Sequence, residues 1–348
     1  MLEELTKKIQ GGQNLTEQEI GNAMDHLLAE GLSDSSKAEF LSSLTKKGET
    51  DDELFAMLLK MDQFSRHIEP KCDGTVIDVC GTGGDNLHTF NISTTASFVI
   101  ASCGGFVAKH GNRSVSGISG SADIFEYFGY DLDTSEDKVT KMLEKFKIAF
   151  LFAQRFHPAM KNVAGARKLL GSRTAFNLLG PLTNPARVKN QLVGVFSDEY
   201  LERIISILKR NSSKNIMTVR SQDGLDELST TSKNDVCYLH EGKIEKMLVD
   251  PEKLGLRNAS LSDIQISSKS EAIKAFLSVL NGTASRPMIE VTMLNAAGGL
   301  MVANIAKDFS DGIELARQTI ESGSTYSHFK TFVKENGNYE KIKEAEEL

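Results

Sequence analysis

Two polar, glycine-rich segments could bind a phosphorylated ligand, and each directly follows a short apolar stretch. Gly81-Thr82-Gly83-Gly84-Asp85 follows residues 75–80, and Lys109-His110-Gly111-Asn112-Arg113 follows residues 106–108. Glycine lets backbone N–H groups approach an anion because no Cβ intervenes. A lysine and an arginine add positive charge to the second segment. These residue types therefore favour electrostatic binding of an anion, and phosphate is the natural candidate.

The elements around the two segments predict where they lie. A helical pattern covers residues 91–104 after the first segment and residues 121–129 after the second. Two consecutive strand-loop-helix units predict parallel strands joined by right-handed crossovers. Ligands of such sheets bind at the carboxyl ends of the strands, which is where both polar segments fall.

Ordinary glycine-rich turns are the alternative interpretation, and a single three-glycine cluster would favour it. Two such loops on neighbouring strands favour function instead. The first loop is not a dinucleotide-binding fingerprint, because Asn86 stands where that motif needs glycine or alanine. The chain also contains no Gly-Lys-Ser or Gly-Lys-Thr sequence of a Walker loop.

Length and composition narrow the class of protein. The chain has 348 residues and a formal net charge of −7, with 40% hydrophobic residues, which predicts one large domain or a large and a small one. The acidic balance and the lack of a basic run argue against a nucleic-acid partner. The four cysteines form no Cys-x-x-Cys pair, which argues against zinc and fits a reducing compartment. Without a signal-peptide or membrane-span pattern, we expect a cytoplasmic protein with no membrane partner.

The expected fold class is α/β, with a mostly parallel central sheet flanked by helices and a small all-helical domain joined by hinges. Residues 1–68 form the helical N-terminal domain, with capping boxes at Thr16 and Thr50. Helices from about 160–190 join it, and residues 74–348 form the α/β domain. Further strands are expected at 148–153, 191–196 and 215–220, a hairpin at 236–249, and helices at 198–210, 272–280, 288–303 and 311–320.

Residues 69–74 look like a linker, and residues 176–185 are dense in helix breakers. We expect the second segment to be an ordered turn or hinge.

Seven motifs in order along the chain resemble the anthranilate phosphoribosyltransferase family, and the match runs from the first helix to about residue 335. They are Gly81-Thr82-Gly83-Gly84-Asp85, Asn91-Ile92-Ser93-Thr94, Lys109-His110-Gly111-Asn112-Arg113, Ser119-Gly120-Ser121-Ala122-Asp123, Gly180-Pro181-Leu182-Thr183-Asn184-Pro185, Asp223-Gly224-Leu225-Asp226-Glu227 and Leu294-Asn295-Ala296-Ala297.

The resemblance implies a reaction, a cofactor and a partner. Phosphoribosyl pyrophosphate (PRPP) and anthranilate would give N-(5-phosphoribosyl)anthranilate and pyrophosphate, with Mg²⁺, in tryptophan biosynthesis. The chain would form a homodimer through its helical part. One departure concerns the family's His-Gly pair before the acidic motif, because Arg220-Ser221-Gln222 stands there in this chain.

Ser93, Asp226 and Glu227 would ligate Mg²⁺ by the same resemblance. Displacing pyrophosphate from a ribose carbon requires charge neutralisation on the leaving group, and a hard divalent cation supplies it. The alternative for an isolated Asp-Glu pair is a solvated turn.

The PRPP site implied by the resemblance spans both polar loops and two helix starts, with Lys109 as the point charge on the pyrophosphate. Helix capping by Asn91 and Ser93 is compatible with this role. The alternative for Lys109 is a surface lysine. The PRPP residues are Gly81, Gly84, Asp85, Thr89, Asn91, Ile92, Ser93, Thr94, Lys109, His110, Gly111, Asn112, Arg113, Ser114, Val115, Ser116, Gly117 and Ser121.

Anthranilate would be bound through its carboxylate and its aryl amine. Arg167 suits the carboxylate because its planar fork stays charged, although the outer face of a basic helix is the alternative. An aryl amine is already neutral near neutral pH, so a general base is barely needed and positioning should dominate. Lys109, Asn112 and Arg167 are the catalytic candidates, and the anthranilate set is Gly81, Asn112, Arg167, His110, His157, Gly180 and Pro181.

Two other functions remain open at this point. A pyrimidine nucleoside phosphorylase shares the architecture, although the Asp-Gly-Leu-Asp-Glu motif is not its signature. A non-catalytic anion-binding protein on the same scaffold is the other, although such copies usually lose ligand residues.

Overall fold

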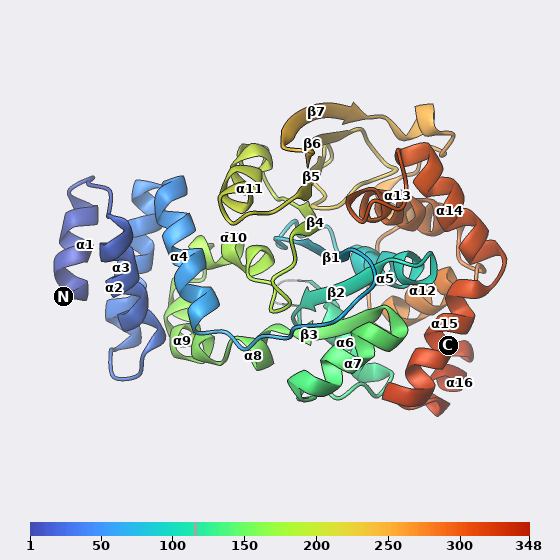
Figure 1. The fold of residues 1–348 in the computed structure, drawn as a ribbon, viewed down its shortest axis with the longest axis horizontal. Coiled ribbons are helices and arrows are strands. Elements are labelled where there is room, and N and C mark those ends of the chain that lie inside the picture. Colours follow the sequence, from blue (N-terminus) through green and yellow to red (C-terminus); the bar gives the residue numbers. More distant parts are fainter. Residues whose placement is uncertain (115–116) are drawn as a thin grey trace.

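The computed structural model describes residues 1–114 and 117–348. A helical bundle lies at one end of an elongated molecule, and a sheet covered by helices forms the rest (Figure 1). The chain starts in the bundle and ends at the far side of the sheet region. Among the described residues, no helix is long and apolar enough to cross a membrane.

The bundle consists of α1 (Leu2–Gln10), α2 (Glu17–Leu28), α3 (Asp34–Lys47) and α4 (Asp51–Gln63). Both predicted capping boxes are confirmed: the side chain of Thr16 accepts from the N–H of Glu19, and that of Thr50 from Glu53. Each glutamate in turn accepts the N–H of its threonine at 2.8 Å. These reciprocal bonds satisfy N–H groups that every helix start leaves without a partner.

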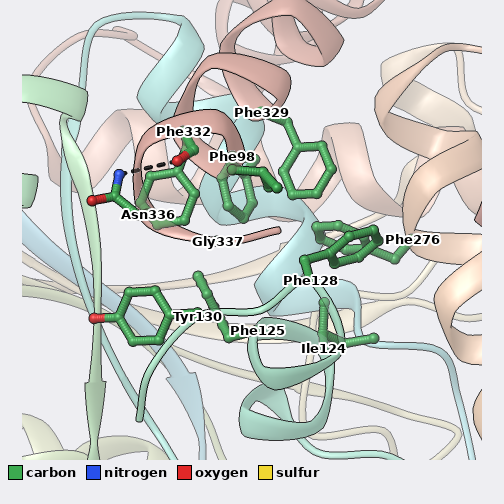
Figure 2. A pocket seen from close by; sticks show the side chains of 11 residues that line it. Phe98, Ile124, Phe125, Phe128, Tyr130, Phe276, Phe329, Phe332, Asn336 and Gly337 are labelled. Carbon is green, nitrogen blue, oxygen red and sulfur yellow. Dashed lines mark hydrogen bonds between the residues drawn. The ribbon is translucent and has the colours of Figure 1, made fainter. Parts of the chain in front are cut away.

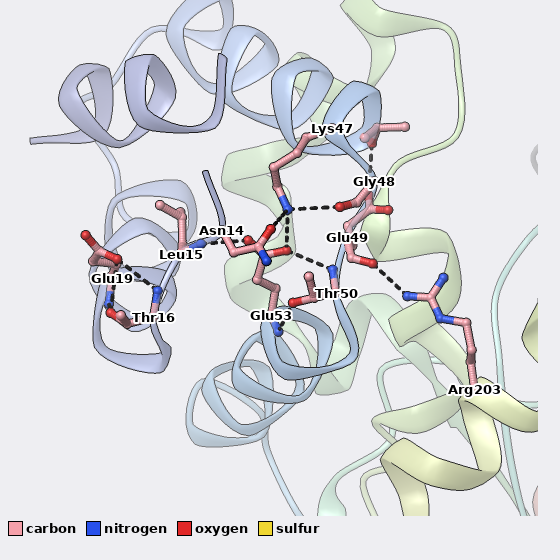
Figure 3. A network of polar contacts seen from close by, with 11 residues as sticks. Asn14, Leu15, Thr16, Glu19, Lys47, Gly48, Glu49, Thr50, Glu53 and Arg203 are labelled. Carbon is pink, nitrogen blue, oxygen red and sulfur yellow. Dashed lines mark hydrogen bonds and ion pairs between the residues drawn. The ribbon is translucent and has the colours of Figure 1, made fainter. Parts of the chain in front are cut away.

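A buried polar network ties the bundle together (Figure 3). Glu53 is 0% exposed and accepts hydrogen bonds from the N–H groups of Leu15 at 2.9 Å and Thr50 at 2.8 Å. Its other partner is the Lys47 ammonium at 2.8 Å. Arg203 donates to the Glu49 carbonyl at 2.7 Å, which links the network to the sheet region.

Helices α9 (Lys161–Leu170) and α10 (Ala175–Leu182) pack on this bundle from later in the chain. The buried Lys37 ammonium donates to the carbonyls of Ala29 and Asn162, at 2.8 and 2.7 Å. A Cβ on Gly165 would lie 1.9 Å from an Asp34 carboxylate oxygen, so only glycine allows this approach between α3 and α9.

The sheet has seven strands in the order β3-β2-β1-β4-β5-β6-β7. The first five are mutually parallel, β6 is antiparallel to β5, and β7 is antiparallel to β6. The predicted fold class and the hairpin are therefore confirmed. The strands are β1 (Val76–Gly81), β2 (Phe106–Gly111), β3 (Ile148–Phe152), β4 (Asn190–Gly194), β5 (Asn215–Ser221), β6 (Asn234–His240) and β7 (Lys243–Val249).

The strand order reverses between β1 and β4. From β1 the chain proceeds outward to β2 and β3, and it then returns to add β4 on the other side of β1. Such a switch point opens a crevice at the carboxyl ends of the two central strands, and ligands of open parallel sheets bind there.

Helices cover both sides of the sheet (Figure 1). Helix α13 packs closely on α5, and a Cβ on Gly299 would lie 2.3 Å from the side chain of Ile100. Helix α7 was not expected from the sequence. The flanking helices are α5 (Ile92–Ser102), α6 (Ser121–Tyr127), α7 (Glu136–Phe146), α8 (Ala153–Phe156), α11 (Glu199–Arg210), α12 (Lys269–Leu280), α13 (Arg286–Val302), α14 (Phe309–Glu321), α15 (Ser324–Asn336) and α16 (Glu340–Glu346).

Two expectations about local structure were wrong. The second strand was expected to end at Ala108, but β2 continues to Gly111, because pairing of residues 109–111 with β3 decides strand length more than residue polarity does. Residues 176–185 were expected to be a turn or hinge, but α10 covers most of them. Pro181 lies in the last turn of α10, where it removes few hydrogen bonds, and the buried Phe176 and Leu179 hold the helix in place.

An aromatic cluster fills the core beneath α5 and α15 (Figure 2). Phe98 meets Phe329 edge-on with ring centroids 5.1 Å apart, and Phe125 stacks on Phe150 at 4.4 Å. The cavity left among the rings is about 10 Å³. That space is at the lower limit for one water molecule, so the cluster is packing and not a ligand site.

Candidate functional site

The acidic motif is seated directly on the carboxyl ends of β1 and β4. A Cβ on Gly81 would lie 2.5 Å from Oδ2 of Asp226, and a Cβ on Gly194 would lie 1.6 Å from the Asp226 carbonyl oxygen. Asp226 Oδ2 accepts a hydrogen bond from the Gly83 N–H at 2.6 Å. The absence of side chains at Gly81 and Gly194 therefore allows the acidic loop and the glycine-rich loop to meet at the switch point.

Carboxylates are crowded at this edge. Burial raises the pKa of Asp226 well above its usual range, and the nearby Asp85 and Glu227 raise it further. Burial also raises the pKa of Glu227 to about 7, although Lys109 and the Ser93 hydroxyl oppose the shift. A cation bound here would relieve the repulsion, and oxygen donors are the ligands that Mg²⁺ prefers.

The residues fit Mg²⁺ as an incomplete coordination shell. In residues 1–114 and 117–348, no three histidine, cysteine, aspartate or glutamate side chains converge as a preformed metal site. Mg²⁺ commonly takes only one or two protein carboxylates and completes its shell with substrate phosphate oxygens and water. The predicted set of Ser93, Asp226 and Glu227 matches this kind of site.

Lys109 is a buried strand residue and not a surface lysine. It is 1% exposed, and its ammonium donates to the Val79 carbonyl at 2.7 Å and to Ser93 Oγ at 3.2 Å. Burial in the sheet therefore places a positive charge between β1 and the start of α5, beside one of the predicted metal ligands.

Two buried oxygens near this lysine lack partners. Asp78, on β1, accepts the His110 N–H at 3.1 Å through Oδ1, while its Oδ2 has no hydrogen-bond donor among the described residues. Asn91 donates to the Ser119 carbonyl at 3.2 Å, and its Oδ1 is also unpaired there. Asn91 makes no side-chain cap on α5, contrary to expectation, because its amide turns toward the segment before α6.

A hydrogen-bonded histidine pair connects the site to the bundle. His110 and His157 are both 6% exposed, and their Nε2 atoms lie 3.2 Å apart. His157 Nδ1 lies 2.6 Å from Ser65 Oγ, which donates to the Met61 carbonyl at 2.7 Å. Ser65 therefore links the histidine pair to the last turn of α4 through the Met61 carbonyl.

Both imidazoles are held neutral. Burial lowers the pKa of His157 to about 4, and the nearby His67 adds to the effect. Burial, His157 and Lys109 lower the pKa of His110 well below its usual range, although the Gly180 carbonyl opposes this. Sequence reasoning missed Ser65, whose only sequence signal is its place just after α4.

The loop after β2 is held by hydrogen bonds to side chains of α6 and α8. Arg113 makes two hydrogen bonds of 2.6 Å to the Glu126 carboxylate, so its charge is already matched. Asn112 Oδ1 accepts from the Arg113 N–H at 2.8 Å and from Gln154 at 3.3 Å. A Cβ on Gly111 would lie 2.7 Å from Ser121 Oγ, which places the start of α6 against the end of β2.

The remaining predicted PRPP residues lie around these loops. Ile92 and Thr94 are buried in the first turn of α5, and Asp85 accepts from the Leu87 N–H at 3.1 Å. Thr89 forms an isolated bridge with Gln265. Ser114 is half-buried and Gly117 is exposed. Val115 and Ser116 lie outside the described residues.

The predicted anthranilate residues outside the strand edge lie on α9 and α10. Arg167 is half-buried, its guanidinium lies 5.9 Å from the Phe176 ring, and burial lowers its pKa. Gly180 and Pro181 belong to α10, and the Pro181 carbonyl accepts from Gln191 of β4 at 2.8 Å. The structure therefore places Arg167 on an inner part of α9 rather than on its solvent face.

Arg173 is a second residue that the sequence did not single out. It stands in the short connection between α9 and α10, its guanidinium lies 3.6 Å above the Phe196 ring, and it donates to the Gly84 carbonyl. Its sequence signal is weak, because one arginine in a breaker-rich connection has no periodicity.

The chain resembles known proteins over nearly its whole length. Residues 73–326 match the glycosyl transferase family a/b domain, and residues 3–65 match the helical bundle domain of that family. The chain is 60% identical over 344 residues to the anthranilate phosphoribosyltransferase of Nitrosopumilus maritimus, covering 99% of both chains. It is 46% identical over 341 residues to that of Cenarchaeum symbiosum, covering 98% of this chain and 99% of the relative.

Solved structures agree with these relatives. The Thermus thermophilus anthranilate phosphoribosyltransferase superposes with a TM-score of 0.87 at 35% identity, covering 94% of this chain and 98% of the other. The Saccharomyces cerevisiae enzyme in complex with PRPP and Mg superposes with a TM-score of 0.86 at 25% identity, covering 99% and 98%.

Proposed function

The chain belongs to the anthranilate phosphoribosyltransferase family, and on this premise we propose that it transfers the phosphoribosyl group of PRPP to the amine of anthranilate. The products are N-(5-phosphoribosyl)anthranilate and pyrophosphate, in the second step of tryptophan biosynthesis from chorismate. The observation that carries the proposal is the meeting of Gly83, Lys109 and the Asp226–Glu227 pair around the switch point of the sheet.

PRPP would lie along the carboxyl ends of β1 and β2. The backbone of the glycine-rich loop accommodates phosphate oxygens, and the N-terminal end of α5 adds the partial positive charge of its free N–H groups. Lys109 is held by Val79 and Ser93 with its charge on this side of the sheet. The unpaired oxygen of Asn91 is available to a ribose hydroxyl.

Ser93, Asp226 and Glu227 would hold Mg²⁺. When bound, the ion would neutralise charge that develops on the leaving pyrophosphate. The chain's own contribution is to bring the carboxylates together on two strand-end glycines and to balance them with Lys109.

Anthranilate would bind between the loop after β2 and helix α9. The Arg167 guanidinium would meet its carboxylate, and Asn112 would orient the ring. His110 and His157 form an uncharged wall of this site. A neutral aryl amine needs little help in losing its proton, so alignment of the amine with the ribose carbon supplies most of the rate.

The division of the chain also enters the proposal. Residues 1–68 with the helices of 160–190 would move against residues 74–348 about the connections at 69–74 and 176–190, closing the site over both substrates. A homodimer through the helical part would be the working form. Sedimentation of the purified chain would test it, and a monomer at assay concentration would contradict it.

Anthranilate fluorescence provides the test of function. We expect the signal to fall when the protein is mixed with PRPP and Mg²⁺, and to stay constant without either. Incubation with thymidine and phosphate should release no thymine. Thymine release without anthranilate consumption would favour a pyrimidine nucleoside phosphorylase, and inertness in both assays would favour a non-catalytic anion-binding protein.

A further inference from the structure

The cationic side chains near the strand ends differ in their hydrogen-bond partners. Lys109 is held by a carbonyl and a hydroxyl, and Arg113 is matched by the Glu126 carboxylate. Arg173 donates to the Gly84 carbonyl and makes no ion pair with any carboxylate in the described part of the chain. It is therefore a full positive charge beside the glycine-rich loop whose hydrogen-bond partner is a neutral oxygen.

Arg173 is solvent-exposed, and contacts with Phe196 and Gly84 position its guanidinium. Its guanidinium carbon lies 3.6 Å from the centre of the Phe196 ring, a cation–π contact that uses none of its N–H donors. Gly84 has φ +86° and receives the guanidinium so closely that a Cβ would lie 2.8 Å from Nη2. Stacking occupies the face of the guanidinium, so its in-plane donors remain available to oxygen atoms.

We propose that Arg173 is a further substrate-binding residue, which exchanges its hydrogen bond to Gly84 for the pyrophosphate group of PRPP. The inference rests on the proposed function, because PRPP is the ligand that brings pyrophosphate to this edge. Phosphate oxygens are charged acceptors, and a guanidinium can meet two of them at once. The exchange replaces a neutral acceptor by a charged one and is therefore favourable.

Pyrophosphate, rather than the carboxylate of anthranilate, is the group favoured by position. Arg173 contacts Gly84, and the adjacent Gly83 binds Asp226 of the predicted metal site. Arg167 lies instead beside Phe176, on the other side of the connection between α9 and α10. Each arginine is thus placed for a different substrate.

Arg173 also joins two parts of the molecule. Helices α9 and α10 flank it and pack on the bundle, whereas Gly84 belongs to the sheet region. A pyrophosphate held by both sides would pull the bundle side toward the strand ends. PRPP would then favour the closed arrangement before anthranilate reacts.

Arg173→Ala and Arg173→Lys test the inference, with Arg220→Ala as the matched control. Arg220 contacts the same residue, because it donates a hydrogen bond to the Phe196 carbonyl oxygen. Its charge, however, is paired with the Asp198 carboxylate at 2.9 Å. For Arg173→Ala we expect the KM for PRPP to rise about 10- to 100-fold, with the KM for anthranilate unchanged. The KM of Arg173→Lys for PRPP should lie between those of the wild type and Arg173→Ala, because lysine keeps the charge but loses the planar, multi-donor guanidinium.

Calorimetry with inorganic pyrophosphate and Mg²⁺ gives a readout without turnover. We expect Arg173→Ala to weaken pyrophosphate binding by the same factor as it raises the KM for PRPP, and Arg220→Ala to leave it unchanged. The proposal is overturned if Arg173→Ala binds pyrophosphate as the wild type does. It is also overturned if only the KM for anthranilate rises, or if Arg220→Ala shows an equal loss.

A failure of the proposed transferase activity can be distinguished from a failure of the role proposed for Arg173. A wild type that binds pyrophosphate but consumes no anthranilate would refute the transferase activity, while the calorimetric comparison would still decide the role of Arg173. If Arg173→Ala did not fold, Arg173→Lys would carry the same comparison, and equal pyrophosphate affinity in that variant and the wild type would refute the contact.

Discussion

The bundle and the strand ends both bury charge, and the two regions are built differently. In the bundle, Glu53 receives two backbone N–H groups and the Lys47 ammonium (Figure 3). At the strand ends, Asp226 receives one backbone N–H from Gly83, while Asp85 and Glu227 crowd it with like charge. The first set is satisfied within the protein, whereas the second combines like charges with one backbone donor, as the proposed metal site requires.

The difference has a physical basis. Burying a charge costs free energy unless protein groups replace the lost water, and a fully satisfied network holds its neighbours in one geometry. An incompletely satisfied set keeps its cost until a ligand arrives, and the relief then contributes to binding. The unpaired oxygens of Asp78 and Asn91 lie in the second set. The bundle network and the carboxylates at the strand ends therefore differ in how far the protein itself satisfies them.

Removing the charge at the strand ends should have the largest effect. Asp226→Asn combined with Glu227→Gln keeps the shapes and the acceptor for Gly83 but removes both charges. We expect kcat to fall about a thousandfold, a barrier increase of about 4 kcal/mol. Anthranilate fluorescence gives the rate, and circular dichroism with urea unfolding controls for folding. A folded variant with near wild-type turnover would show that these carboxylates are not metal ligands.

Breaking the saturated network should affect stability rather than turnover. Lys47→Met removes the ammonium from the buried Glu53 and leaves that carboxylate without its countercharge. We expect the free energy of unfolding to fall by about 3 to 5 kcal/mol, with kcat/KM nearly unchanged below the unfolding transition. Urea titration measures the first quantity. A loss of activity without a loss of stability would contradict the division between the two regions.

The histidine pair lies between the two regions and should report through pH. His157 has a pKa of about 4 in the folded chain, against the usual 6.5. Between these values the unfolded chain binds a proton that the folded chain excludes, so the free energy of unfolding should fall as the pH drops through this window. The full shift corresponds to about 3 kcal/mol.

Comparison of the wild type with His157→Gln isolates this contribution. Unfolding in urea from pH 7 to pH 4 should show a shallower pH dependence in the variant, although His110 continues to act in the same direction. Equal slopes in the two proteins would show that His157 is not buried in its neutral form.

Arg167→Ala should have the smallest of these effects. We expect the KM for anthranilate to rise about tenfold, close to 1.4 kcal/mol, with the KM for PRPP unchanged. Lys168→Ala is the control, because Lys168 is an exposed neighbour on the same helix. Unchanged anthranilate kinetics in Arg167→Ala would remove Arg167 from the site.

Local patterns explain why much of the fold could be predicted. The capping boxes at Thr16 and Thr50 are set by residues three apart, and the parallel sheet follows from alternating strands and helices. The order of the motifs also predicted, through the family resemblance, that the glycine-rich loop and the acidic pair belong to the same binding site. The turn or hinge expected at 176–185 is mostly helix α10 instead, because burial of its apolar side chains outweighs the breakers Gly180 and Pro181.

The sequence alone determined which residue types this chain has for holding a phosphorylated sugar, and that they follow strands, because both properties are local. Tertiary structure decided which cations are free. Arg113 is matched by Glu126, whereas Lys109 is buried beside Ser93 and Arg173 lies over Phe196. Whether a charge is available depends on partners far away in the chain, and only the packed fold brings those partners together.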